Sequence, residues 1–148
     1  MFRCATCGAF NRVREPRPAG EATCGRCHQT LDLSGKPQEV DGDGLRRAVE
    51  ASPVPVLVDL WAPWCGPCRA SAPVLDTLGR SRPGRLLVLK LNTDENPQAS
   101  SALNVRGIPT FILYTGGREV QRLSGAMPLA ELERWLARAQ DVGQGARA

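Results

Sequence analysis

Trp64-Cys65-Gly66-Pro67-Cys68 lies at the end of an apolar run, Val54 to Leu60. The run predicts a buried strand, and a helix is expected to begin at the two cysteines. Free N–H groups at a helix N-terminus favour a thiolate over a thiol, and Pro67 suits the first helical turn, where no backbone N–H is needed. Because the spacing lets Cys68 attack a mixed disulfide formed on Cys65, the pair predicts a redox-active site rather than a structural crosslink.

The composition is typical of one ordinary domain with a small appendage. The chain has 148 residues, of which 42% are hydrophobic. Its formal net charge of +4 comes from 19 basic residues that are spread along the chain and mixed with 15 acidic ones. We therefore expect no nucleic-acid partner. No apolar stretch reaches about 18 residues, and the N-terminus lacks the apolar run of a signal peptide. These features favour a protein with no membrane partner in the reducing cytoplasm, where cysteines serve metal binding or catalysis.

Four more cysteines form two C-x-x-C pairs near the N-terminus, Cys4/Cys7 and Cys24/Cys27. The 16 residues between the pairs fall within the range typical of a four-thiolate zinc site. One structural Zn²⁺ is therefore expected on Cys4, Cys7, Cys24 and Cys27. Two unrelated pairs in a disordered tail are one alternative, and two disulfides in an oxidising compartment are another.

The N-terminal segment contains too few large apolar side chains to fold without a metal or disulfides. We therefore predict a zinc-binding domain over residues 1–33, a linker over 34–40, a main domain over 41–140 and a flexible tail over 141–148. His28, the only histidine, could replace a cysteine ligand, although a solvent-facing place or one outside the ligand set fits better.

The main domain alternates predicted strands and helices before a hairpin and a last helix. Asp43 is expected to cap the first helix, and Pro73 is expected to bend the second. Gly116-Gly117 is a hairpin signal. This order predicts an α/β fold with a mixed central sheet covered by helices on both faces. Strands are expected at 54–60, 86–91, 110–114 and 119–123, and helices at 44–51, 70–78, 96–104 and 128–140.

Several motifs together carry a resemblance to one family. The segment from Val58 to Cys68 is similar to the active-site segment of thioredoxins, and further matches follow in order between residues 40 and 140. They are Lys90-Leu91-Asn92, Asp94, Asn96-Pro97, Arg106-Gly107-Ile108-Pro109-Thr110 and Gly125. With the N-terminal cysteines, the whole chain resembles the zinc-containing bacterial type, thioredoxin 2. The resemblance implies a thioredoxin-like fold preceded by a small zinc ribbon or knuckle. Leu60 departs from the phenylalanine usual in the family, which affects only local packing.

Asp59 is the one charged residue in an otherwise apolar predicted strand. A carboxylate there is costly unless it is paired, hydrated or protonated, although a solvent-facing place at the strand edge would also explain it. The resemblance implies a buried acid that accepts the proton of Cys68 through water, with Lys90 of the neighbouring strand tuning it. Cys65, as the exposed nucleophile, would attack a substrate disulfide, and Cys68 would then release the reduced substrate.

The resemblance also implies a substrate-binding surface around the cysteines. Ile108-Pro109 would form a cis-proline loop whose backbone pairs with an extended substrate. Trp64 would be a partly exposed contact, and Gly125 would permit close approach of a partner's backbone. The expected substrate-binding residues are Trp64, Gly66, Pro67, Ile108, Pro109 and Gly125.

These features favour a monomeric enzyme that reduces protein disulfides and is recharged by an NADPH-dependent thioredoxin reductase. The chain has no dinucleotide-binding glycine motif, so we expect it to bind neither flavin nor nicotinamide. An alternative of a different class is a binding module, in which the zinc knuckle docks a protein or nucleic acid and the rest is a scaffold. A third hypothesis is redox regulation through oxidation of the four zinc thiolates.

Overall fold

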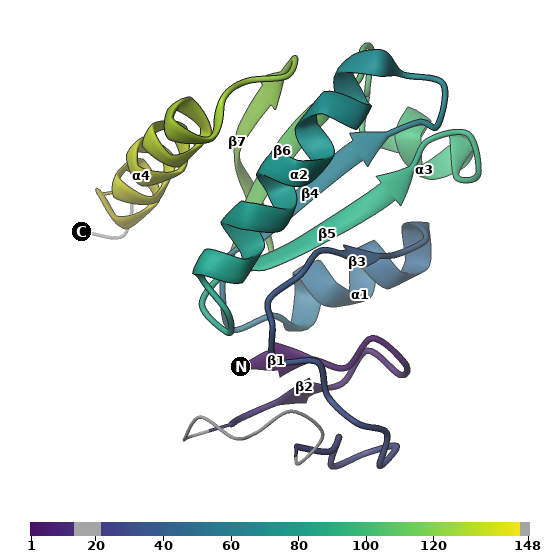
Figure 1. The fold of residues 1–148 in the computed structure, drawn as a ribbon, viewed down its shortest axis with the longest axis vertical. Helices are drawn as coiled ribbons and strands as arrows, with labels where there is room; N and C mark the ends of the chain where they lie inside the picture. Colours follow the sequence, from purple (N-terminus) through teal and green to yellow (C-terminus); the bar gives the residue numbers. More distant parts are fainter. Residues whose placement is uncertain (14–21, 146–148) are drawn as a thin grey trace.

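The computed structural model describes residues 1–13 and 22–145 (Figure 1). Its strands are β1 (Phe2–Arg3), β2 (Phe10–Asn11), β3 (Gln38–Glu39), β4 (Val56–Trp61), β5 (Leu87–Asn92), β6 (Thr110–Thr115) and β7 (Arg118–Ser124). Its helices are α1 (Gly42–Ala51), α2 (Gly66–Ser81), α3 (Pro97–Ala102) and α4 (Leu129–Gly145). No helix within the described ranges combines the length and the apolar character needed to cross a membrane.

The centre of the molecule is a five-stranded sheet in the order β3-β5-β4-β6-β7. β5 is parallel to both β3 and β4, whereas β6 is antiparallel to both β4 and β7. Helices α2 and α4 pack on one face, and α1 and α3 pack on the other. This mixed sheet, covered on both faces, confirms the predicted fold class.

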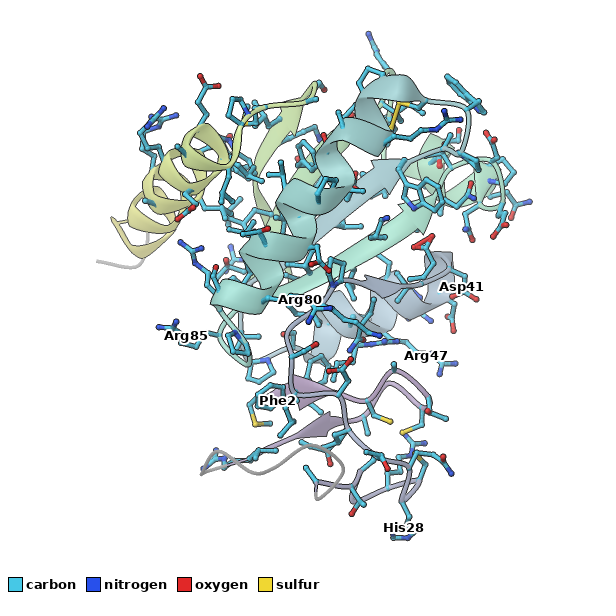
Figure 2. The ribbon with its side chains drawn as sticks, viewed as in Figure 1. Phe2, His28, Asp41, Arg47, Arg80 and Arg85 are labelled. Carbon is cyan, nitrogen blue, oxygen red and sulfur yellow. A yellow bond between two sulfur atoms is a disulfide. The ribbon has the colours of Figure 1, made fainter. Side chains whose placement is uncertain are left out.

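The N-terminal knuckle, residues 1–13 and 22–33, lies at the end of the molecule opposite the start of α2 (Figure 1). Its two cysteine pairs adopt the same turn, because the first cysteine of each exchanges backbone hydrogen bonds with residues four and five positions later. The knuckle docks through Phe2, whose ring lies against Gly84 (Figure 2). Arg3 adds two hydrogen bonds with Gln38, at 2.8 and 3.0 Å.

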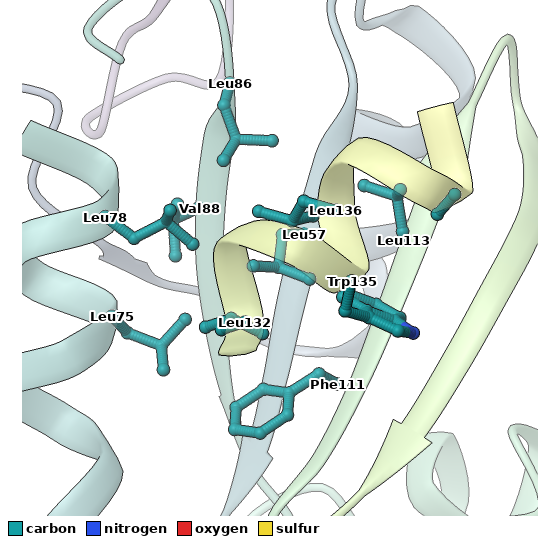
Figure 3. Close-up of a cluster of buried hydrophobic side chains, with 11 residues drawn as sticks. Leu57, Leu75, Leu78, Leu86, Val88, Phe111, Leu113, Leu132, Trp135 and Leu136 are labelled. Carbon is teal, nitrogen blue, oxygen red and sulfur yellow. The ribbon is translucent and has the colours of Figure 1, made fainter. Parts of the chain in front are cut away.

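Strand β4 is buried on both faces, which explains its nearly continuous apolar sequence. Leu57 points toward α2 and α4, while its neighbours Val56 and Val58 point toward α1 and α3. Figure 3 shows the first of these two clusters, in which Leu75 of α2 and Trp135 of α4 close over the sheet. The site described below therefore stands on a rigid, close-packed support.

The predicted strands and helices lie where expected, with boundaries moved by a few residues, and two differences matter. Asp41, not Asp43, caps α1, because its Oδ1 accepts a hydrogen bond from the Gly44 N–H at 2.7 Å. The helix begins earlier than expected because the Gly42 N–H is held by Asn96 Oδ1 at 3.2 Å. The predicted linker over residues 34–40 contains β3 and is part of the sheet.

The C-terminal boundary also differs from the prediction. Helix α4 continues to Gly145, beyond the predicted start of a tail at residue 141. The remainder of that predicted tail, residues 146–148, lies outside the described residues.

Candidate redox site and metal centre

Cys65 and Cys68 form a disulfide at the N-terminus of α2, with their Cα atoms 5.2 Å apart. Cys65 is the N-cap residue of the helix, and its Sγ accepts a hydrogen bond from the Cys68 N–H at 3.2 Å. The sequence predicted an exposed Cys65, but only 4% of this residue is exposed in the disulfide form. The reason is packing, because Trp61 and Ile108 cover the pair. The helix N-terminus supplies the environment that stabilises a thiolate once the bond is reduced.

The loop at Ile108-Pro109 lies directly over this disulfide. Its peptide bond is cis, and the Ile108 carbonyl oxygen is 3.8 Å from Cys65 Sγ. Gly125 closes the loop from the other side, since its N–H donates to the Pro109 carbonyl at 2.9 Å. Gly125 has a φ of +98°, a conformation that glycine adopts without strain. The structure thus brings Ile108 to the cysteines and joins Gly125 to the Pro109 loop.

Trp64 is the large hydrophobic residue exposed on this surface, with 67% of its area accessible. Its indole Nε1 donates a hydrogen bond to Asp94 Oδ2 at 3.0 Å. Gly66 and Pro67 are exposed beside it at the start of α2. A side chain added at Gly66 would meet nothing within 4 Å, so this part of the surface is open to a partner.

Asp59 is buried beneath the site, with 1% of its surface exposed, so the alternative of a solvent-facing place is wrong. Neither of its carboxyl oxygens has a hydrogen-bond partner among the described residues. Burial raises the pKa of Asp59 to about 7, while the charge of Lys90 lowers it and that of Glu39 raises it. An acid in this state exchanges protons near neutral pH, which is the property a proton acceptor for a thiol needs.

Lys90 is next to Asp59 in the register of β5 and β4, but it does not form a direct ion pair with that carboxylate within the described residues. Its Nζ instead lies 4.7 Å from the centre of the Trp61 ring. Lys90 therefore acts on Asp59 through its field rather than through contact.

The sequence assigned no role to three residues that lie around the redox pair. Glu39 accepts a hydrogen bond from Trp61 Nε1 at 3.0 Å, and Asp94 accepts the one from Trp64. Ser71 carries a buried hydroxyl without a hydrogen-bond partner in the described part of the chain, one helical turn after Cys68. A polar residue at helical spacing from Cys68 was the only signal for Ser71, and Asp94 was noticed only as a family position.

The second site is the cluster of Cys4, Cys7, Cys24 and Cys27, whose sulfur atoms all lie within 4.8 Å of one another. Two of the sulfur pairs are 3.6 Å apart. Zn–S bonds of about 2.3 Å in a tetrahedron place sulfurs about 3.8 Å apart, so the cluster fits zinc. His28 is exposed and points away from the cluster at the far end of the knuckle (Figure 2), as the sequence favoured.

Backbone N–H groups of the knuckle favour the thiolate form of Cys24, which is the form that binds a metal. Hydrogen bonds from the N–H groups of Cys27 and Arg26 lower the pKa of Cys24 to about 6. Asn11 adds its side-chain amide, with Nδ2 at 3.6 Å from Cys24 Sγ and Oδ1 accepting from the Gly25 N–H at 2.9 Å. This was a further residue that the sequence did not single out.

Comparisons with known proteins agree with this geometry. The family model described as Thioredoxin matches residues 36–138. Thioredoxin C-3 of Corynebacterium nephridii is 42% identical over 142 residues, 96% of this chain and 97% of that protein. Thioredoxin 1 of a Nostoc species is 46% identical over 98 residues, 66% of this chain and 92% of that protein. The solved structure of a mutant thioredoxin from Halobacterium salinarum NRC-1 superposes with a TM-score of 0.64 at 32% identity, covering 70% of this chain and 90% of that one.

Proposed function

The chain belongs to the thioredoxin family of thiol-disulfide oxidoreductases, and from that premise we propose that it reduces protein disulfides and is recharged by an NADPH-dependent thioredoxin reductase. The observation that carries the proposal is the Cys65–Cys68 disulfide at the start of α2, beside an open surface at Trp64 and Gly66. A buried structural disulfide would have no such surface.

The reaction follows from the positions of the two thiols. In the reduced protein, the Cys65 thiolate attacks one sulfur of the substrate disulfide, and the other substrate sulfur leaves as a thiolate. Cys68 then loses its proton and attacks Cys65 Sγ, which breaks the mixed disulfide and frees the second substrate thiol. Two electrons have passed to the substrate, and the protein is left with the Cys65–Cys68 bond seen here.

Asp59 is proposed to take the proton of Cys68 in the second step. Its burial supports this role, because its pKa of about 7 makes both protonation states accessible at neutral pH. Lys90 is proposed to favour the ionised form through its positive charge.

The substrate is proposed to lie across Trp64, Gly66, Pro67, Ile108, Pro109 and Gly125. The Ile108 backbone supports this placement, since its carbonyl oxygen already faces Cys65 Sγ. An extended segment could pair with it by strand addition. Substrates would then be chosen by their backbone and by a few side chains around Trp64.

Zinc is proposed to have a structural role on Cys4, Cys7, Cys24 and Cys27, where it would crosslink the knuckle. The ion would supply folding energy to a segment whose own apolar core is small. We further propose a cytoplasmic monomer whose zinc-binding unit, residues 1–33, precedes the thioredoxin domain.

The test is the reduction of a model protein disulfide by zinc-loaded protein, with NADPH and a thioredoxin reductase. NADPH consumption is expected with the natural chain and is expected to vanish in Cys65→Ser. A matched Cys7→Ser variant separates the two cysteine sites, since it should lose zinc but keep its active-site pair. Absence of turnover by folded, zinc-loaded protein would contradict the proposal and point to a binding module or another electron donor.

A further inference from the structure

Three charged side chains form a row across neighbouring strands of the sheet. Glu39 of β3 is the register partner of Lys90 in β5, and Lys90 is the register partner of Asp59 in β4. Register partners in adjacent strands project from the same face, so the row is carboxylate, ammonium, carboxylate. Asp59 is buried, Lys90 is half-buried and Glu39 is exposed, so the row leads from the interior to the edge of the sheet.

One indole holds the outer part of this row together. Trp61 lies two residues after Asp59 on the same face of β4, and its Nε1 donates to Glu39 Oε1 at 3.0 Å. The face of the same ring carries Lys90 Nζ at 4.7 Å from its centre. Trp61 therefore contacts both Glu39 and Lys90, and Lys90 forms no direct ion pair with either carboxylate within the described residues.

We propose that Glu39 is a positioning residue for the proton transfer at Asp59, because its carboxylate, in register with Lys90 and joined to it through the Trp61 ring, partly offsets the positive charge that Lys90 presents to Asp59 and so leaves Asp59 able to take up and return a proton. This inference rests on the proposed role of Asp59 as acceptor of the Cys68 proton. In that step the proton passes from Cys68 to Asp59, while the Cys68 sulfur electron pair forms the bond to Cys65 Sγ, the Cys65–substrate bond breaks and the substrate sulfur leaves as a thiolate.

The charges around the row agree with this arrangement. The pKa of Asp59 is raised first by burial, then lowered by Lys90 and raised by Glu39. The pKa of Glu39 is itself raised, with burial as the largest cause; Lys90 and the Trp61 hydrogen bond act against it, and Glu95 adds to it. Cys68 is the group that α2 contributes on this side once the disulfide is reduced. Glu39 lies in β3, within the segment over residues 34–40 that joins the knuckle to the sheet, and β5 separates it from the buried Asp59.

The first test is the Glu39→Gln variant of the full-length oxidised protein. Glutamine keeps an oxygen that can accept the Trp61 hydrogen bond but removes the charge. The readout is the pH titration of the Asp59 carboxyl carbon by ¹³C NMR. We expect the Asp59 midpoint to fall by about half a pH unit, a small shift because solvent screens the exposed Glu39. Glu50→Gln is the matched control, since this exposed acid on α1 faces Arg46 and should leave the midpoint unchanged.

An unchanged Asp59 midpoint in folded Glu39→Gln protein would overturn the inference. The same pH titration of the natural chain is a second test that needs no variant, because two interacting carboxyls titrate as a pair. Its Asp59 curve should show a second, smaller inflection at the pH where the Glu39 carboxyl carbon itself titrates. A curve with a single inflection would count against the coupling even if the variant failed to fold.

The consequence for the reaction is measured in a single turnover with protein reduced beforehand, so that no reductase is needed. The pH midpoint for the second, resolving step is expected to fall in Glu39→Gln together with that of Asp59. A shifted Asp59 titration with an unmoved rate profile would overturn the positioning role. Failure of the NADPH-coupled assay alone would leave this single turnover intact, so the two proposals fail in distinguishable ways.

Discussion

Trp64 Nε1 donates a hydrogen bond to Asp94 Oδ2 at 3.0 Å, across the loops that follow the neighbouring strands β4 and β5. This bond fixes the orientation of the one large apolar side chain exposed in the described part of the molecule. An indole held in one position loses less entropy when a partner packs against it. Asp94 thereby belongs to the redox surface although it does not contact the cysteines.

Asp94→Ala is therefore expected to slow the reduction of a protein disulfide. The loss of one exposed hydrogen bond corresponds to about 1 kcal/mol, or about fivefold in kcat/KM. Asp94→Asn is the matched control, because its amide oxygen still accepts the indole N–H and most of the rate should remain. Equal rates for the two variants would show that the hydrogen bond does not matter to substrate contact.

Asp59→Asn is expected to stabilise the fold, and the gain should grow with pH. The carboxyl has a pKa of about 7 when folded, against an ordinary aspartate value of 3.8. Between these values the folded state binds more protons than the unfolded state, so the free energy of unfolding decreases as the pH rises and levels off above 7. The pKa difference corresponds to on the order of 4 kcal/mol at most.

Denaturant unfolding at about pH 4 and about pH 8 measures this effect. The advantage of Asp59→Asn over the natural chain should be larger by a few kcal/mol at the higher pH. Asp76→Asn serves as the control, since that carboxylate lies on the surface of α2 with 47% of its side chain exposed. A gain for Asp59→Asn that does not vary with pH would show that the acid is not buried as described.

The redox pair and the sheet strands around it were accessible from the sequence because their signals are local. β4 is recognisable as an apolar run, interrupted only by Asp59, before two cysteines, and the zinc cluster as paired cysteines at a fixed spacing. β3 gave no such signal, since it consists of Gln38 and Glu39 alone. Two polar residues carry no alternation of apolar and polar positions, and their place in the sheet depends on a parallel partner about 50 residues later.

The site residues divide in the same way between local patterns and tertiary contacts. Asp59 stood out as a charge within its own apolar strand, whereas Glu39 gains its meaning only from the register of β3 with β5. Asp41 precedes α1 and Asp43 lies in its first turn, and Asn96, far away in sequence, sets the earlier start of the helix by binding the Gly42 N–H. Local sequence patterns predicted the reactive residues, whereas the residues that hold them in place depend on tertiary contacts.

Gly35→Ala is expected to destabilise the protein through the predicted linker. Gly35 has a φ of +82°, and a Cβ there would collide with the carbonyl oxygen of Gly79, near the end of α2. Both the left-handed backbone and the close approach oppose a side chain, for a cost of roughly 1–3 kcal/mol. Thermal unfolding measures it, with Gly66→Ala as the control, because a Cβ at Gly66 meets nothing within 4 Å. Equal melting temperatures for the two variants would contradict the close contact.

Asn11→Ala is expected to weaken zinc binding while leaving all four cysteines in place. The Asn11 side chain donates to Cys24 Sγ and to the Ala9 carbonyl, and it accepts from the Gly25 N–H, so it holds the second cysteine turn against β2. Removal of such a support beside a metal ligand typically lowers affinity by about tenfold or more. Competition with a zinc chelator under reducing conditions measures the loss.

Two control variants give the upper and lower limits of zinc affinity for this measurement. Gln29→Ala alters an exposed side chain of the same turn and should bind zinc like the natural chain. Cys24→Ser removes a ligand and should lose most of the affinity, since three thiolates leave the tetrahedron open. If Asn11→Ala behaves like Gln29→Ala, the hydrogen bonds of Asn11 do not organise the site; a value between the two variants places Asn11 as a determinant of how firmly the knuckle holds its metal.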